Sequence, residues 1–141
     1  MRHKVDGRLF GRPANQRKAL LRGIVTALFE NQRIETTVAK AKEAKRIAER
    51  MITFGIKGDL HSKRQVLAYV TDRTVASKLF NDIAPRFSGR NGGYLRLVQT
   101  RQRLKDSAPM AILEFIDYET VKKPKGKLAK ADKAAKEDKK A

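Results

Sequence analysis

Residues 37–55 read TVAKAKEAKRIAERMITFG, and they carry the clearest structural pattern in the chain. At about 100° per residue, the turn of an α-helix, the small and apolar side chains form one stripe and the bases gather on the opposite side. The stripe consists of Ala41, Ala44, Ile47, Ala48, Met51 and Ile52, and the bases are Lys42, Lys45, Arg46 and Arg50. The stretch therefore predicts a helix capped by Thr37, running to about Gly55 and packed on a core.

The basic side of this helix has two interpretations. It can offer charge to a phosphate backbone while the apolar stripe packs inward. Alternatively, it is an ordinary solvated helix face, on which Glu43 and Glu49 cancel part of the positive field. The sequence leaves both open.

Two elements precede the helix. Residues 13–31 place apolar side chains at helical spacing, and Pro13 suits a first helical turn. Residues 33–38 alternate, with Ile34, Thr36 and Val38 on one side, which is typical of a short strand.

Two helices and two strands are expected after it. Asp59 is a candidate cap for a third helix, and a fourth begins near Asp72 and ends at Pro85. Residues 94–101 and 110–117 read as strands, and the linker between them favours an antiparallel hairpin. The predicted fold is α+β, with about four helices on one face of a small, about three-stranded mixed sheet.

The charge is concentrated at the two ends. The 141 residues hold 33 Lys and Arg against 15 Asp and Glu, a net charge of +18. Residues 1–22 contain seven bases and one acid, and residues 122–141 contain nine lysines and three acids. We expect an extended basic arm over 1–12, one globular domain over 13–121 and a disordered Lys/Ala-rich tail over 122–141. Such a surplus favours a polyanionic partner.

Catalysis has little support in the sequence. The chain has no cysteine, and its two histidines, His3 and His61, are far apart. No glycine-rich loop opens a helix as nucleotide-binding motifs require, and no carboxylates are spaced as metal ligands. We expect no enzymatic activity, no cofactor, no metal and no small-molecule substrate. No apolar run approaches the roughly 20 residues of a membrane span.

The segment 86–94, RFSGRNGGY, combines arginine, glycine and aromatic residues. Glycines let the backbone come close to a partner, and arginine pairs bidentately with phosphate. Phosphate contact is therefore predicted for Arg86, Arg90 and Arg96. Phe87 and Tyr94 have two interpretations. They stack on unpaired bases, or Phe87 anchors the core and Tyr94 is the first residue of a strand, and we favour the second interpretation.

Several segments in register resemble the bacterial-type family of large-ribosomal-subunit protein seventeen. They are MRHK (1–4) with Gly7-Arg8, IETTVAKAK (34–42), Met51-Ile52-Thr53, ASKLF (76–80), PRF (85–87), GGY (92–94) with Arg96, and DSAPMA (106–111). The resemblance runs from Met1 to about Asp117 and does not cover the lysine-rich tail.

The resemblance implies a non-catalytic structural component of the large subunit, located in the cytoplasmic ribosome. It implies binding to large-subunit ribosomal RNA (rRNA) and to neighbouring ribosomal proteins, around the peptide exit tunnel. It assigns RNA contact to Arg2, His3, Lys4, Arg8, Arg86, Arg90 and Arg96. The charge pattern adds Arg12, Lys18, Arg22, Lys40, Lys42, Lys45, Arg46, Arg101 and Arg103 as RNA-binding candidates.

Two rival functions fit parts of the sequence. The helices near 60–70 and 72–84 can be taken for a DNA-binding helix-turn-helix, but the second offers only Arg73 and Lys78 as bases. The second rival function is membrane-surface binding by a basic amphipathic helix. The apolar faces of the predicted helices lack the large aromatic anchors that such binding uses.

Overall fold

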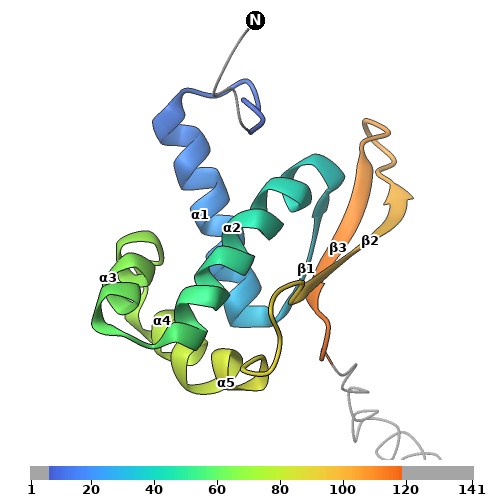
Figure 1. The fold of residues 1–141 in the computed structure, drawn as a ribbon. Coiled ribbons are helices and arrows are strands. Elements are labelled where there is room, and N and C mark those ends of the chain that lie inside the picture. The colour runs from blue at the N-terminus through green and yellow to red at the C-terminus, as the bar shows by residue number, and fades with distance from the viewer. Residues whose placement is uncertain (1–6, 119–141) are drawn as a thin grey trace, which may run out of the picture.

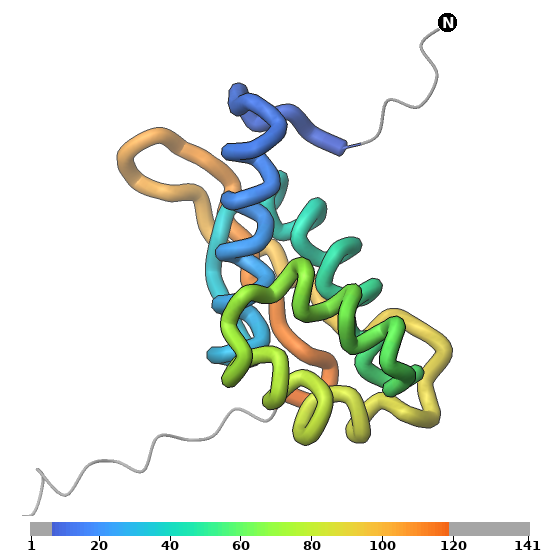
Figure 2. The backbone as a smooth tube through the Cα atoms, turned by 90° about the vertical axis from the view of Figure 1, so that its left-hand side faces the viewer, coloured from blue at the N-terminus to red at the C-terminus, as the bar shows by residue number. Residues whose placement is uncertain are grey.

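The structure is a computed structural model, and it describes residues 7–118. Its elements, in chain order, are α1 (Ala14–Asn31), β1 (Arg33–Thr37), α2 (Val38–Lys57), α3 (Leu60–Tyr69), α4 (Arg73–Lys78), the π-helical segment η1 (Leu79–Ile83), α5 (Ala84–Arg86), β2 (Leu95–Gln102) and β3 (Pro109–Phe115). The helices pack on one face of the sheet, as Figure 1 shows, which confirms the α+β prediction. The β2–β3 hairpin projects beyond the helices (Figure 2).

The sheet has the order β1-β3-β2, and both of its pairings are antiparallel. The predicted hairpin is therefore confirmed, but the sheet is not mixed. The helical crossover from β1 to β2 does make these two strands parallel to each other. Because β3 inserts between them, no parallel pair is hydrogen-bonded within the described residues.

Helix α2 lies at the centre of the fold, against α1, α3 and the sheet. The predicted apolar stripe faces the core: Ala41, Ala44, Ala48, Met51 and Ile52 are all buried. Thr37 occupies the N-cap position, but its side chain makes no capping hydrogen bond. The helix ends two residues later than expected, where Gly58 adopts a left-handed φ of 68° that glycine accommodates without strain.

The fourth helix is a continuous helical run from Arg73 to Arg86 that changes type in its middle. The prediction that Pro85 ends it was wrong, because Pro85 lies inside α5. The preceding turn widens to a π-helix, in which the Ala84 N–H donates to the Leu79 carbonyl. A wider turn relieves the clash between a proline ring and the carbonyl four residues before it, so the helix continues past the proline.

Aromatic side chains join the end of this run to the sheet. The Phe115 ring stacks on Phe87 at 5.8 Å and on Phe29 at 6.4 Å, and Phe87 contacts Tyr94 at 5.4 Å. Phe87 and Tyr94 are each 3% exposed. The predicted role of Phe87 as a core anchor is confirmed. Tyr94 was predicted to be the first residue of a strand, but β2 begins one residue later, at Leu95. Neither ring is open to a base.

Both chain ends extend beyond the described residues. Of the predicted arm, residues 7–12 are described, and they reach α1 through a turn in which the Arg12 N–H donates to the Leu9 carbonyl at 3.1 Å. Residues 1–6 and the predicted tail over 122–141 lie outside the described part of the chain.

Candidate nucleic-acid interface

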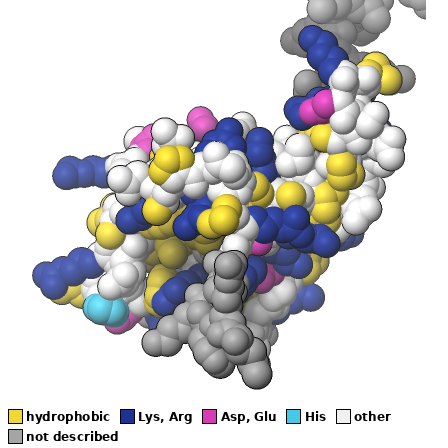
Figure 3. Space-filling model, turned by 90° about the horizontal axis from the view of Figure 1, so that it is seen from above, with side chains coloured by type: hydrophobic (Ala, Val, Ile, Leu, Met, Phe, Trp, Pro, Cys, Tyr) yellow, Lys and Arg dark blue, Asp and Glu magenta, His cyan; other side chains and the backbone are white. Residues whose placement is uncertain are grey.

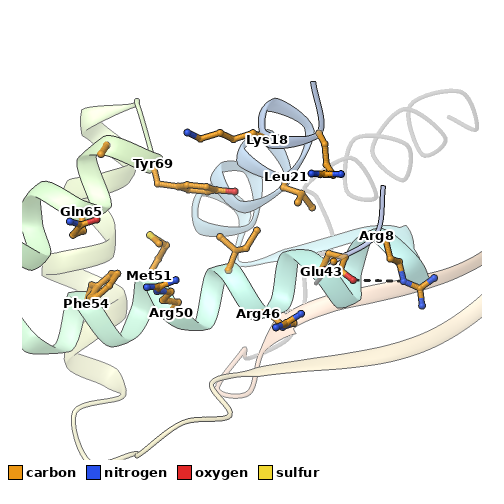
Figure 4. Close-up of a pocket in the computed structure, with 14 residues that line it drawn as sticks. Arg8, Lys18, Leu21, Glu43, Arg46, Arg50, Met51, Phe54, Gln65 and Tyr69 are labelled. Atoms are coloured by element: carbon orange, nitrogen blue, oxygen red, sulfur yellow. Dashed lines mark ion pairs between the residues drawn. The ribbon is translucent and has the colours of Figure 1, made fainter. Parts of the chain in front are cut away.

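A groove of about 630 Å3 lies where α1, α2 and α3 meet, with the arm at one end (Figure 4). Its basic lining residues come from three different elements: Arg8 from the arm, Arg17 and Lys18 from α1, and Arg46 and Arg50 from α2. Glu43 is the one acidic residue in this lining. We call this set of residues the helical groove. Its excess of four positive charges is larger than that of the hollow at the hairpin tip or of the hollow between α3 and α4, so it attracts anions more strongly than either.

The floor of the helical groove is apolar and aromatic. Leu21, Ile47, Met51, Phe54 and Tyr69 line it below the basic rim. This composition follows from helix packing, since the edges of the three apolar stripes meet here without a further described element to cover them. A basic rim over an apolar floor suits a ligand with both charged and aromatic parts.

Two arginines lie over aromatic rings beside the groove. The Arg50 guanidinium is 5.7 Å from the Phe54 ring centroid, and that of Arg22 is 5.8 Å from Tyr69. Burial raises the pKa of Tyr69 above its ordinary value, and the positive charge of Arg22 partly opposes this. Tyr69 is therefore a neutral hydroxyl at physiological pH, and it adds no negative charge to the site.

Arg8 ties the arm to α2. Its Nε lies 3.8 Å from Oε1 of Glu43, whose side chain is only 17% exposed. This contact places Arg8 at the mouth of the helical groove. It also places a base directly against the one acidic side chain of the groove, which weakens the negative field of that carboxylate.

The structure brings together only part of the residue set predicted to bind RNA. Arg8, Lys18 and Arg46 line the helical groove, and Arg22 lies beside it over Tyr69. On the same helices, Lys40 is half-buried, Lys42 is exposed and Lys45 pairs with Glu49 at 3.9 Å. Arg12 is exposed and donates to the Phe10 carbonyl at 2.9 Å. Arg2, His3 and Lys4 fall outside the described residues.

Two groove residues, Arg17 and Arg50, were absent from the predicted set. The sequence did hold a signal for both. Arg50 follows Arg46 by four residues, the spacing that puts two side chains on one helix face, and Arg17 precedes Leu21 by four.

The remaining predicted arginines lie at the sheet, and most of them have carboxylate partners. Arg96 donates to Glu114 at 2.6 Å and 3.0 Å, Arg103 pairs with Asp106, Arg101 lies 3.7 Å from Glu35 and Arg86 lies 3.2 Å from Asp117. Arg90 is exposed and has no carboxylate partner among residues 7–118. Most of the predicted arginines near the sheet thus have a carboxylate partner, whereas five bases and one acid line the helical groove.

Features of other functional classes are missing from the described residues. Residues 7–118 contain no group of three or more His, Asp or Glu side chains placed to hold a metal ion. None of the helices described here is long and apolar enough to cross a membrane. Seen from above, basic side chains far outnumber acidic ones on the surface (Figure 3). The described residues thus form a small basic α+β protein.

Comparison with known proteins narrows this class to one family. The family model of ribosomal protein L17 matches residues 20–116. The large ribosomal subunit protein bL17 of Thermodesulfovibrio yellowstonii is 61% identical over 135 residues, which is 96% of this chain and 99% of that protein. The bL17 protein of Symbiobacterium thermophilum is 58% identical over 106 residues, 75% of this chain and 94% of its own. The chain belongs to the ribosomal protein L17 family, and it is a structural, non-enzymatic component of the large ribosomal subunit.

The first of these matches also changes the expectation for the lysine-rich tail. A match that covers 135 of 141 residues necessarily includes residues 7–135. The similarity therefore extends beyond Asp117, where the sequence resemblance was expected to end, and the tail has a counterpart in at least one relative.

Proposed function

We propose that the chain scaffolds large-subunit rRNA by placing an RNA segment in the helical groove, with the basic arm beside it. The observation that carries the proposal is the convergence of five bases from three elements on one hollow that contains one acid. The binding is non-catalytic, in the exit-tunnel region of the cytoplasmic ribosome, with neighbouring ribosomal proteins alongside.

The chemistry of the groove suits RNA better than a simple anion. Phosphates of one strand are several ångströms apart, and bases projecting from different helices can pair with successive ones. Neutralised phosphates release counterions, which supplies most of the sequence-independent affinity. Between phosphates, an unpaired nucleotide offers a flat apolar surface to Tyr69 or to the guanidinium of Arg50, as is usual in RNA recognition.

Among the predicted RNA-binding residues, the proposal rests on Arg8, Lys18 and Arg46, together with Arg17 and Arg50. Lys42 continues the same side of α2, four residues before Arg46. Arg2, His3, Lys4 and Arg12 belong to the arm, which we propose orders along the RNA as it binds.

The DNA-binding alternative loses support from the geometry of α4. Asp72 accepts hydrogen bonds from the Thr74 backbone and hydroxyl, so its negative charge lies at the end that a recognition helix would present to bases. Lys78 points the other way, and its Nζ donates to the Glu30 carbonyl at 2.7 Å. Arg73 is therefore the one base of α4 that is available to contact a groove of DNA.

Sedimentation of a cell lysate tests the proposed function. We expect the chain to migrate with the large subunit at both high and low magnesium and to stay there after a moderate salt wash. Migration at the top of the gradient, or with bulk DNA, would contradict it.

A further inference from the structure

We propose that the open face of the sheet, with the tip of the β2–β3 hairpin, docks a neighbouring ribosomal protein and not rRNA. This deepens the partner assignment of the proposed function, but it depends on a different surface from the helical groove. No described helix covers this face, which carries Arg33 and Glu35 of β1, Arg96 and Val98 of β2, and Met110, Ile112 and Glu114 of β3. The tip comprises residues 103–108.

Most of the charges of this face are paired within the chain. In the strand register, Glu114 lies between Arg33 and Arg96, and its carboxylate is 3.4 Å from Arg33 Nε and 2.6 Å from Arg96 Nη2. Arg101 lies against Glu35, and Arg103 makes two hydrogen bonds to Asp106. Counting Arg101, the face and the tip hold five bases and three acids, a smaller surplus than that of the helical groove, so they attract a polyanion less strongly.

Redirecting these arginines to phosphate would have a cost. The Glu114 side chain is 8% exposed, so moving Arg96 toward an RNA strand would leave a buried carboxylate with only Arg33 as its partner. A buried charge that loses a partner is strongly destabilising. Bringing phosphates to the same spot would also place them near this carboxylate, which repels them.

Apolar side chains project between the paired charges. Leu104, at the tip, is 95% exposed, and Val98, on the open face, is 41% exposed. Met110 and Ile112 of the central strand lie half-buried on the same face. Leu104 and Met110 border a shallow hollow of about 320 Å3, together with Arg101 and Lys105. Phosphate gains nothing from such surface, whereas a protein partner buries it.

The tip holds Leu104 in a defined place. The Arg103 N–H donates to the Ala108 carbonyl at 3.0 Å, and the Ser107 N–H donates to the Arg103 carbonyl at 2.8 Å. The two-pronged contact from Arg103 to Asp106 closes the same loop, with distances of 2.8 Å and 2.6 Å. A side chain presented on a pre-ordered loop loses little entropy on docking, which favours it as an anchor.

These observations define the partner's chemistry. It is a protein surface with an apolar pocket for Leu104 and an apolar strip for Val98. Because Lys105 and the outer parts of the paired arginines give the rim a small positive surplus, the partner's rim is expected to carry carboxylates.

Photo-crosslinking in intact ribosomes tests the inference. A photoreactive phenylalanine analogue replaces Leu104, Val98 or Lys18 in three separate strains, and large subunits are purified and irradiated. We expect the Leu104 and Val98 positions to cross-link to one and the same large-subunit protein, identified by mass spectrometry, in a product that resists ribonuclease. Cross-links from positions 98 and 104 to rRNA would overturn the inference. So would the absence of any cross-link from these two positions in an experiment in which position 18 cross-links well.

The Lys18 position separates this inference from the proposed function. If position 18 fails to cross-link to rRNA, that result contradicts RNA binding in the helical groove, but it does not contradict protein docking on the sheet. A second arm uses Leu104→Asp, which we expect to lower the cross-link from position 98 by about tenfold or more, as for loss of an interface anchor. Leu60→Asp is the matched control, because Leu60 is a comparably exposed leucine (64%) on α3. An equal loss in both variants, or in neither, would overturn the inference.

Discussion

Arg96 on β2 donates two hydrogen bonds to one oxygen of Glu114 on β3, from Nε at 3.0 Å and from Nη2 at 2.6 Å. Residues 96 and 114 are direct cross-strand partners, and Arg33 of β1 stands opposite Glu114 on its other side. One carboxylate thus links all three strands at the same register position. An arginine that the sequence assigned to RNA therefore contributes to the structure of the sheet.

Removing this carboxylate should weaken the fold. We expect Glu114→Gln to lower the free energy of unfolding by about 1–2 kcal/mol, because two partly exposed arginines lose the charge of their common partner. Urea denaturation of the free protein measures this. Glu35→Gln is the control: its exposed pair with Arg101 should contribute no more than about 0.5 kcal/mol. Equal effects of the two substitutions would show that the contacts of Glu114 with Arg33 and Arg96 have no special role in stability.

Two glycines in helices should respond to alanine in opposite directions. A Cβ on Gly55 would lie 3.0 Å from the Cβ of Ala84, which is fixed to the α5 backbone and cannot rotate away. We expect Gly55→Ala to cost about 1 kcal/mol or more of unfolding free energy. A Cβ on Gly23 of α1 would meet nothing within 4 Å, so Gly23→Ala should stabilise by about 0.5–1 kcal/mol. A thermal melt of each variant checks the signs, and stabilisation by both would refute close packing of α2 on α5.

The hairpin tip should change with pH only in strong acid. Hydrogen bonds from the Arg103 side chain, and then from the Ala108 N–H, lower the pKa of Asp106 to about 2. Since the folded pKa lies below the ordinary value of 3.8, the stabilisation from this pair is complete above about pH 4 and is lost as the pH falls through about 2. An NMR titration of the Asp106 carboxyl measures the midpoint.

Substitutions at the tip provide the controls for this titration. Arg103→Ala should return the midpoint of the Asp106 titration toward 3.8, whereas Arg101→Ala, which alters a base two residues away, should leave it near 2. A midpoint near 3.8 in the unaltered protein would contradict the ordered tip.

Local patterns predicted the elements better than they predicted their arrangement. The stripe of α2, the cap at Asp59, the start of the fourth helix near Asp72 and the hairpin all follow from neighbours within a few residues, and the structure bears them out. The central position of β3 depends on its pairing with β1, more than seventy residues earlier, and no local signal records it. Continuation of the fourth helix through Pro85 depends on packing that supports a π-helical turn.

The same distinction applies to the site. Charge counts and helical spacing predicted Lys18 and Arg46 as RNA-binding residues, and both line the helical groove; the same spacing accounts for Arg50. They could not show that Arg96 and Arg103 pair with carboxylates, because one contact joins residues on different strands and the other depends on the exact shape of a loop. Charge alone predicts how many bases a chain offers, and the fold determines which of them are paired with acids at the sheet.

The most direct test of the central claim is the salt dependence of rRNA binding by the full-length chain. The groove variant combines Arg17→Ala, Lys18→Ala and Arg50→Ala, and the control combines Arg101→Ala, Arg103→Ala and Lys105→Ala, with the same change in charge. Binding of each to a large-subunit rRNA transcript is measured over a range of salt concentrations. We predict that the groove variant binds more weakly and that its logarithmic salt slope falls by about two to three, as for the loss of three phosphate contacts, while the control stays close to the unaltered protein. Unchanged affinity and slope in the groove variant, or an equal loss in the control, would contradict the account.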